Sequence, residues 1–126
     1  MADVFELSGT YGTSTGGVAV SAVPEVSAPI SEKLSLIRKA ISRITLSTDV
    51  AVAIDLSGLT QINVLIIKTI GGKVMARITS ADGSTQAVPV DSFFAIISSS
   101  VPITAVDLTR VVGTSTTVEV FLGEKA

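Results

Sequence analysis

Apolar and polar residues alternate along most of the chain from Val50 onward, a period of two that is typical of half-buried β-strands. Val74, Ala76 and Ile78, for example, lie on one side of an extended segment. Turn-forming residues interrupt this pattern about every 8 to 12 residues, as in antiparallel sandwiches and barrels. We therefore predict an all-β fold, a single antiparallel β-sandwich of the jelly-roll or immunoglobulin-like kind over residues 31–126. The expected strands are 50–56, 62–70, 73–79, 86–90, 93–97, 103–111 and 117–122.

The first 30 residues have a different composition from the rest of the chain. Gly9 to Gly17 is low in complexity, and two prolines follow at Pro24 and Pro29. Such a segment buries too little side-chain surface to offset the entropy lost on ordering. We expect residues 1–30 to form an extended N-terminal arm that becomes ordered against a partner.

Residues 31–48 fit two kinds of secondary structure. Leu34, Ile37, Ile41 and Ile44 recur at helical spacing, and the segment follows a possible helix start. The pairs 34/36 and 44/46 alternate instead, and several Ser and Thr residues are poor helix formers. The pattern leaves helix and strand open, with a slight preference for a strand because strands follow.

The composition argues against catalysis. The chain has no Cys and no His, so thiolate chemistry, the usual general base and the commonest metal ligand are missing. The segment from Asp55 to Gly58 is best interpreted as a turn at a strand end, and the one from Gly71 to Lys73 lacks the spacing of a phosphate-binding loop. We predict a protein that is not an enzyme and has no catalytic residue, cofactor or metal.

The chain is also unusually apolar. Only 16% of its residues are charged, against about 25% in typical soluble domains, and its mean hydropathy is +0.65. This balance predicts that other chains cover part of its apolar surface, including further copies of itself. Neither a basic cluster nor a set of stacking aromatics indicates nucleic-acid binding. The chain starts without a signal-peptide pattern and has no membrane-length apolar run, so we expect a soluble protein made in the cytoplasm.

Five apolar side chains are candidates for binding a partner. The adjacent Phe93 and Phe94 point to opposite faces of a strand, so that one belongs to the core and the other needs a cover. We take Phe94 as the candidate from this pair, and the others come from the arm. The predicted partner-binding residues are Phe5, Tyr11, Val18, Val20 and Phe94.

Two-thirds of the chain, from about Ser47 to Gly123, resembles small structural proteins of tailed bacteriophages in the order of its sequence segments. The similar segments are Asp55 to Ser57 after alternating Val and Leu, Val64 to Lys68, Val74 to Gly83, Val88 to Ile97, Ile103 to Thr109 and Thr116 to Gly123.

The resemblance implies a β-sandwich that occurs in the virion as a capsid decoration or as a collar, tail or fibre-base subunit. Its partners would be itself and major capsid, portal, neck or tail proteins. An alternative is a carbohydrate- or receptor-binding module of a fibre, although such modules stack sugars on exposed Trp or Tyr. This chain has no Trp, and its one Tyr is Tyr11. A pilus or surface subunit is a further alternative that would need export.

Overall fold

The computed structural model describes residues 3–12, 27–98, 100–111 and 114–126. In these ranges every regular element is a strand and none is a helix, so the all-β prediction is confirmed. The strands are β1 (Asp3–Gly12), β2 (Ser27–Leu46), β3 (Val52–Ala53), β4 (Val64–Ile70), β5 (Val74–Ser80), β6 (Thr85–Val90), β7 (Phe93–Ile97), β8 (Ile103–Arg110) and β9 (Thr116–Lys125).

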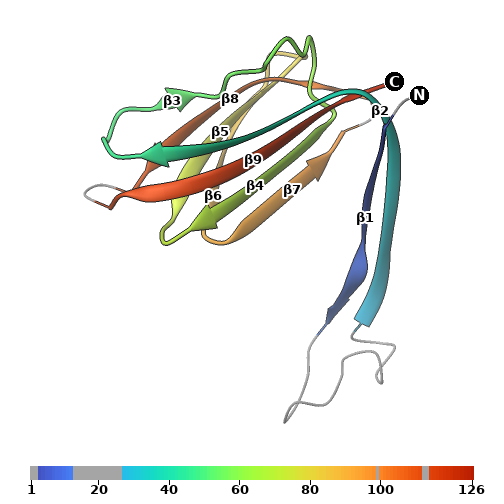
Figure 1. Cartoon of the computed structure of the whole chain (residues 1–126), viewed down its shortest axis with the longest axis horizontal. Coiled ribbons are helices and arrows are strands. Elements are labelled where there is room, and N and C mark those ends of the chain that lie inside the picture. Colours follow the sequence, from blue (N-terminus) through green and yellow to red (C-terminus); the bar gives the residue numbers. More distant parts are fainter. Residues whose placement is uncertain (1–2, 13–26, 99, 112–113) are drawn as a thin grey trace.

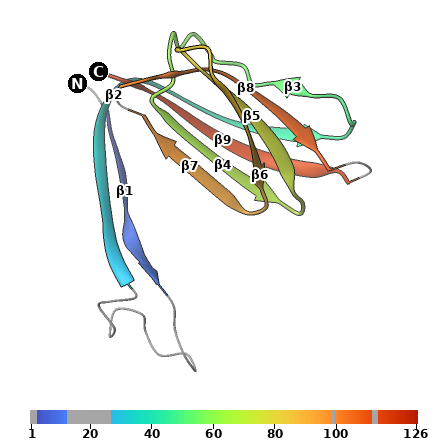
Figure 2. The ribbon, with the colours of Figure 1, turned by 180° about the vertical axis from the view of Figure 1, so that it is seen from behind.

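The strands form two antiparallel sheets. Sheet A has five strands in the order β1-β2-β9-β4-β7, and sheet B has four in the order β3-β8-β5-β6. After β2 the chain changes sheet at each connection, apart from the hairpin that joins β5 to β6. Figures 1 and 2 show the two layers from opposite sides, with the β1–β2 hairpin extending away from them.

One hydrophobic core fills the space between the sheets, because each strand turns alternate apolar residues inward. In β5 Val74, Ala76 and Ile78 are buried while Met75 and Arg77 are exposed. Several of the core side chains are completely shielded from solvent. The buried core residues are Leu46, Ile54, Leu59, Ile62, Leu65, Ile67, Val74, Ala76, Ile78, Val90, Ile103, Val106, Leu108, Val118, Val120 and Leu122.

Asp82 and Gly83 lie in the tight turn that joins β5 to β6. Gly83 has a φ of +87°, in the left-handed region that favours glycine. The Asp82 Oδ1 atom accepts hydrogen bonds from the Ser84 hydroxyl at 2.6 Å and from its backbone N–H at 2.9 Å. Both hydrogen bonds lower the pKa of Asp82, and the one from the Ser84 hydroxyl has the larger effect.

Residues 31–48 lie almost entirely in the long strand β2, which resolves the choice between helix and strand. β2 pairs with β1 along one edge and with β9 along the other. Its backbone groups pair with β1 over residues 27–36 and with β9 over residues 36–46, so that each half of the strand is held in the sheet along one side.

The extended arm predicted for residues 1–30 is not confirmed. The described part of this segment forms a hairpin in which β1 pairs with β2 from Asp3 opposite Leu36 to Gly12 opposite Ser27. The predicted boundary at residue 30 falls inside β2, which continues without a break into the body of sheet A. Before the low-complexity run, Phe5 and Leu7 alternate with polar residues, as a strand requires.

Candidate interaction surface

A β-bulge in β2 changes the side of the strand on which its apolar residues lie. The pairing with β9 runs from Leu36 opposite Lys125 to Arg38 opposite Glu124, which leaves Ile37 as an extra residue. On the far side of the bulge Ala40, Ile44 and Leu46 face the core. Because one added residue reverses the alternation, Leu36 faces the outer side of sheet A instead.

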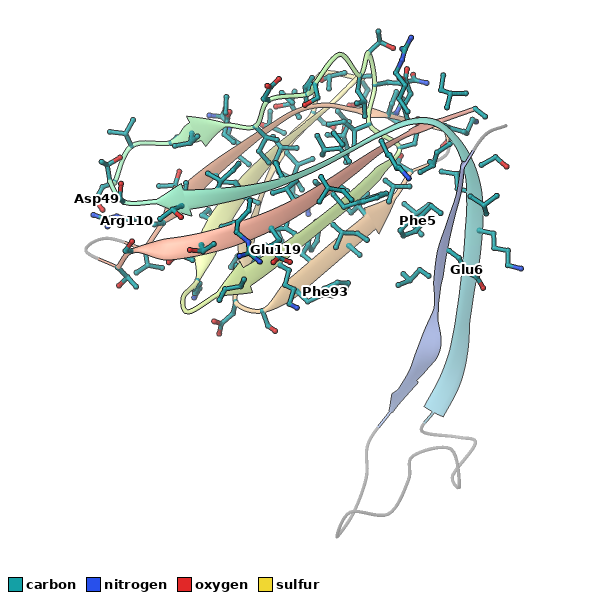
Figure 3. The ribbon with its side chains drawn as sticks, in the orientation of Figure 1. Phe5, Glu6, Asp49, Phe93, Arg110 and Glu119 are labelled. Carbon is teal, nitrogen blue, oxygen red and sulfur yellow. The ribbon has the colours of Figure 1, made fainter. Side chains whose placement is uncertain are left out.

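The apolar side of the β1–β2 hairpin packs on one end of this outer side. The rings of Phe5 and Phe121 lie 5.6 Å apart at an angle of 32°, and Phe121 points outward between the buried Val120 and Leu122. This is a favourable spacing for two aromatic rings. Figure 3 shows Phe5 on the side of β1 that faces the body of the molecule.

Gly123 allows Leu36 to pack closely on β9 because it has no side chain. A Cβ atom on Gly123 would lie 3.0 Å and 3.1 Å from the two methyl groups of Leu36 and 3.3 Å from the Cβ of Val64. Leu36 is consequently only 2% exposed, and Val64 is fully buried although it belongs to the outer side of β4. The hairpin therefore covers this end of sheet A with tight apolar packing.

Next to the hairpin, the outer face has an open row of apolar residues. Four residues on neighbouring strands stand opposite one another across it. Ile41 is 74% exposed, and the others are half-buried. We call these four residues the outer apolar row, and they are Ile41, Phe121, Ile66 and Ala95.

The next row along the same face mixes charge with a second exposed ring. It contains Arg43, Glu119, Lys68 and Phe93 in register, and Phe93 is 56% exposed. Arg43 and Glu119 form an ion pair. A shallow depression of about 150 Å³ lies between the two rows, bounded mainly by apolar side chains. An apolar surface with a charged border is the usual arrangement of a protein-binding site.

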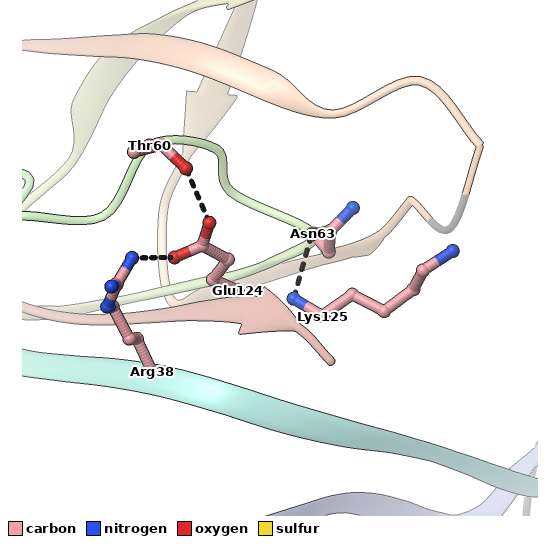
Figure 4. Close-up of polar contacts among 5 residues, drawn as sticks. All are labelled: Arg38, Thr60, Asn63, Glu124 and Lys125. Atoms are coloured by element: carbon pink, nitrogen blue, oxygen red, sulfur yellow. Dashed lines mark hydrogen bonds and ion pairs between the residues drawn. The ribbon is translucent and has the colours of Figure 1, made fainter.

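A polar network closes the end of the core beside the hairpin (Figure 4). Glu124, which is 3% exposed, accepts a hydrogen bond of 2.6 Å from the Thr60 hydroxyl and forms an ion pair of 3.3 Å with Arg38. The hydrogen bond from Thr60 has the largest effect and lowers the pKa of Glu124. Arg38 lowers this pKa further, whereas burial acts in the opposite direction. Asn63 accepts from the Lys125 backbone N–H and donates to the Ser98 carbonyl, both at 2.8 Å. These contacts hold β9 to the segment before β4 and are structural.

The polar motifs noted in the sequence form turns. The Asp55 Oδ1 atom accepts a hydrogen bond of 2.9 Å from the Ser57 backbone N–H, and Ser57 and Gly58 both have positive φ angles. Gly71, with a φ of +80°, lies in the turn between β4 and β5. Among the described residues no group of three carboxylates, His or Cys side chains could hold a metal ion.

Two of the five predicted partner-binding residues have described side chains. Phe5 is half-buried against Phe121, and Phe94 packs against the core. The exposed ring of the adjacent pair is therefore that of Phe93. Tyr11 lies in β1 opposite Ala28, and its side chain is not among the described ones. Val18 and Val20 fall outside the described residues.

Sequence reasoning missed the outer apolar row itself. One signal was present in the segment Thr117 to Leu122, where Val118, Val120 and Leu122 share one face. Phe121 must then point to the other face, so that an aromatic ring is expected on the outside. The contribution of Ile41 had no comparable signal, because its side depends on the bulge at Ile37.

Comparison with known proteins does not assign the chain to a family. Its sequence matches no protein-family model and has no significant similarity to a curated protein. Within the described ranges, no helix has the length and apolarity that a membrane span requires.

Proposed function

We propose that this chain is a non-enzymatic structural subunit of a tailed-phage virion, which binds capsid, neck or tail proteins as a decoration, collar or tail accessory subunit. The observation that carries the protein-binding part of this proposal is the open outer apolar row, in which Ile41 is 74% exposed. The virion as the location rests on the resemblance of residues 47–123 to phage structural proteins.

The strand order supports assigning the domain to the jelly-roll kind of β-sandwich. Without β1, the sheets are β2-β9-β4-β7 and β3-β8-β5-β6, so that first and last strands are neighbours and most connections cross the core. This is the winding of an eight-stranded double-sheet jelly roll, an architecture used in viral capsid proteins and in lectins. Architecture alone does not specify function, so it supports the proposal only in combination with the surface.

Burial on binding explains why the outer face is apolar. An exposed Ile and Phe next to two half-buried rings would reduce solubility if they stayed in water. Covered by another subunit, the same side chains gain the hydrophobic free energy that stabilises an interface. The mixed charges Arg43, Glu119 and Lys68 beside them would orient the partner.

A receptor- or carbohydrate-binding module of a fibre is the second candidate. A depression of about 120 Å³ lies where β5, β6 and β8 begin or end, and Ser80, Ser84 and Thr85 contribute hydroxyl groups to it. Hydroxyl groups can bond to sugars, but none of the residues that line this depression is aromatic. A glycan-array signal that is lost on Thr85→Ala would favour this candidate.

The test of the first proposal is the protein content of purified phage particles. Particles should be isolated on a density gradient from cells in which the chain is encoded and expressed, and analysed by quantitative mass spectrometry. We expect the chain in a fixed ratio to the major capsid protein. If the chain is abundant in the same cells and absent from the particles, the proposal is wrong.

A further inference from the structure

We propose that the free edge of β7 is a dimer site, at which β7 pairs antiparallel with β7 of a second copy and joins the two five-stranded sheets into one. This inference deepens the proposed function and rests on it, because it names another copy of the chain as one of the bound subunits. β7 is an unprotected edge strand. Its open backbone N–H and C=O groups can pair with the same groups of a second copy that is related to the first by a two-fold axis.

The hydrogen bonds to β4 fix which β7 groups are open. Thr69 donates to Ser92 at 3.0 Å, and Ser98 donates to Asn63 at 2.7 Å, in the register that pairs Ile67 with Phe94. In an antiparallel ladder, bonded and non-bonded pairs alternate. Phe94 and Ile96 therefore bond to β4, whereas the N–H and C=O groups of Phe93, Ala95 and Ile97 point to the free edge.

The open groups of β7 are self-complementary. A two-fold axis at Ala95 places Ala95 opposite its own copy and Phe93 opposite Ile97 of the second copy. All three open positions then meet open positions, and together they form about six backbone hydrogen bonds. A shift by one residue would pair open groups with bonded ones. A shift by two would pair Phe93 with Ala95 and leave Ile97 without a partner in β7, so the register centred on Ala95 forms the most bonds.

The side chains of β7 favour the same register as its backbone groups. Phe93 and Ile97 both lie on the outer side of sheet A, so the exposed ring of Phe93 would be covered by Ile97 of the second copy. On the inner side, Phe94 would lie beside Ile96 of the other copy, and both already pack against the core. The outer apolar row would continue from Ala95 into the row of the second copy, which doubles the surface available to further subunits.

The other edge strands in the described residues carry protection that β7 lacks. β6 bonds to β5 through alternate residues, as the Ser80–Ser84 bond and the register show, so its open positions are Thr85, Ala87 and Pro89. Proline has no N–H to donate. β1 carries Asp3 and Glu6, and β3 has two residues. The part of β2 beyond β1 is also an edge of sheet A, and it carries Arg38, Lys39 and Arg43. β7 contains five residues, Phe93 to Ile97, with no charge, Pro or Gly, which is the composition of an exposed pairing edge.

The first test is the solution mass of the wild type and of two matched proline variants. Ala95→Pro removes an open N–H from β7 without breaking a bond to β4, and Ala87→Pro does the same at the edge of β6. By light scattering we expect wild type and Ala87→Pro at twice 12.9 kDa, and Ala95→Pro at 12.9 kDa. A monomeric wild type, or a folded Ala95→Pro that keeps the dimer mass, would overturn the inference.

Amide hydrogen exchange on the wild type is the second test, and it holds even if Ala95→Pro fails to fold. We expect slow exchange at Phe93, Ala95 and Ile97, although each is open in a single copy, and fast exchange at Ala87. Fast exchange at the three β7 amides while Phe94 and Ile96 stay protected would refute the dimer.

The tests separate this inference from the proposed function. A monomer that is still present in phage particles would refute the dimer and leave the structural role intact. A β7-paired dimer that is absent from particles would do the reverse.

Discussion

The outer faces of the two sheets differ in chemistry, although both sheets contribute to the same core. Sheet A presents Ile41 and Phe93 together with half-buried rings, whereas sheet B presents Arg77 opposite Asp107 and Thr79 opposite Ala105. Met75 is the exposed large apolar residue at the centre of sheet B, at 43%. The inward residues of both sheets are determined by packing, so only the outward residues are free to differ.

This difference is the reason for placing the proposed contact on sheet A. A polar outer face is the ordinary condition of an antiparallel sheet that has one side in water. Sheet A departs from that condition next to the hairpin, where Phe5 and Leu36 already lie on the same face. The hairpin thus covers one end of the apolar face and leaves the other end exposed, where we propose that a partner binds.

The largest expected effect is on assembly, and it should differ between substitutions on the outer faces of sheet A and sheet B. Ile41→Asp places a charge in the outer apolar row, whereas Met75→Asp places one at the centre of the outer face of sheet B. We expect Ile41→Asp to reduce incorporation into particles at least about 30-fold, the effect of losing one interface hot spot of about 2 kcal/mol. Met75→Asp should incorporate normally, measured by mass spectrometry of purified particles. Equal losses would show that sheet A is not the binding face.

The second effect concerns the covered end of sheet A. Gly123→Ala introduces a Cβ atom at 3.0 Å from Leu36, and we expect it to lower the free energy of unfolding by about 1–3 kcal/mol through overpacking. Chemical denaturation measures this loss. In the background of Leu36→Ala, which removes the clashing methyl groups, Gly123→Ala should cost less. Additive effects of the two changes would contradict the contact between them.

A third effect is the acid sensitivity that Glu124 contributes. Its pKa is lowered from the ordinary value of 4.5, so the folded state binds the proton less tightly than the unfolded state does. The resulting stability is present above that value and is lost as the pH falls through the lowered pKa. Between about pH 6 and pH 3 the urea midpoint of the wild type should fall more steeply than that of Glu124→Gln.

Asp82 provides the internal control for this profile. Its pKa is also lowered, from 3.8, and it contributes the same acid-dependent loss to both proteins. Parallel profiles for the wild type and Glu124→Gln would show that the hydrogen bonds to Thr60 and Arg38 do not stabilise the carboxylate.

The smallest effect is expected from the charges beside the outer apolar row. Arg43 and Glu119 are both partly in water, with side-chain exposures of 66% and 36%. A double-mutant cycle with Arg43→Ala and Glu119→Ala should give a coupling below about 1 kcal/mol that decreases with added salt. A larger, salt-independent value would mean that this pair stabilises the sheet itself.

The sequence predicted the strands best where alternation and turns agree. β5 and β9 follow from Val74 to Ile78 and from Val118 to Leu122, and the β5–β6 turn follows from Asp82 and Gly83. β2 was predicted only as a slight preference for a strand over a helix, because the bulge at Ile37 interrupts its alternation. With Leu34 before the bulge and the outward Ile41 after it, the apolar residues recur at intervals that match a helix.

The candidate site was harder to predict than the fold. Ile41, Phe121, Ile66 and Ala95 come from four strands, and only the sheet order places them in one row. The choice between Phe93 and Phe94 was equally open, because alternation shows that two neighbours face opposite sides without showing which side is the core. Both answers require the tertiary structure.

The length of β2 has a mechanical consequence. The same strand forms half of the projecting hairpin and then continues along β9 as the outermost strand of sheet A (Figure 1), so a load on the hairpin passes directly along its backbone. A pull along β2 loads many of its hydrogen bonds to β9 at once, whereas a sideways pull opens them one after another. We therefore expect the hairpin to resist tension along its axis and, under bending, to yield first at the bulge beside Ile37.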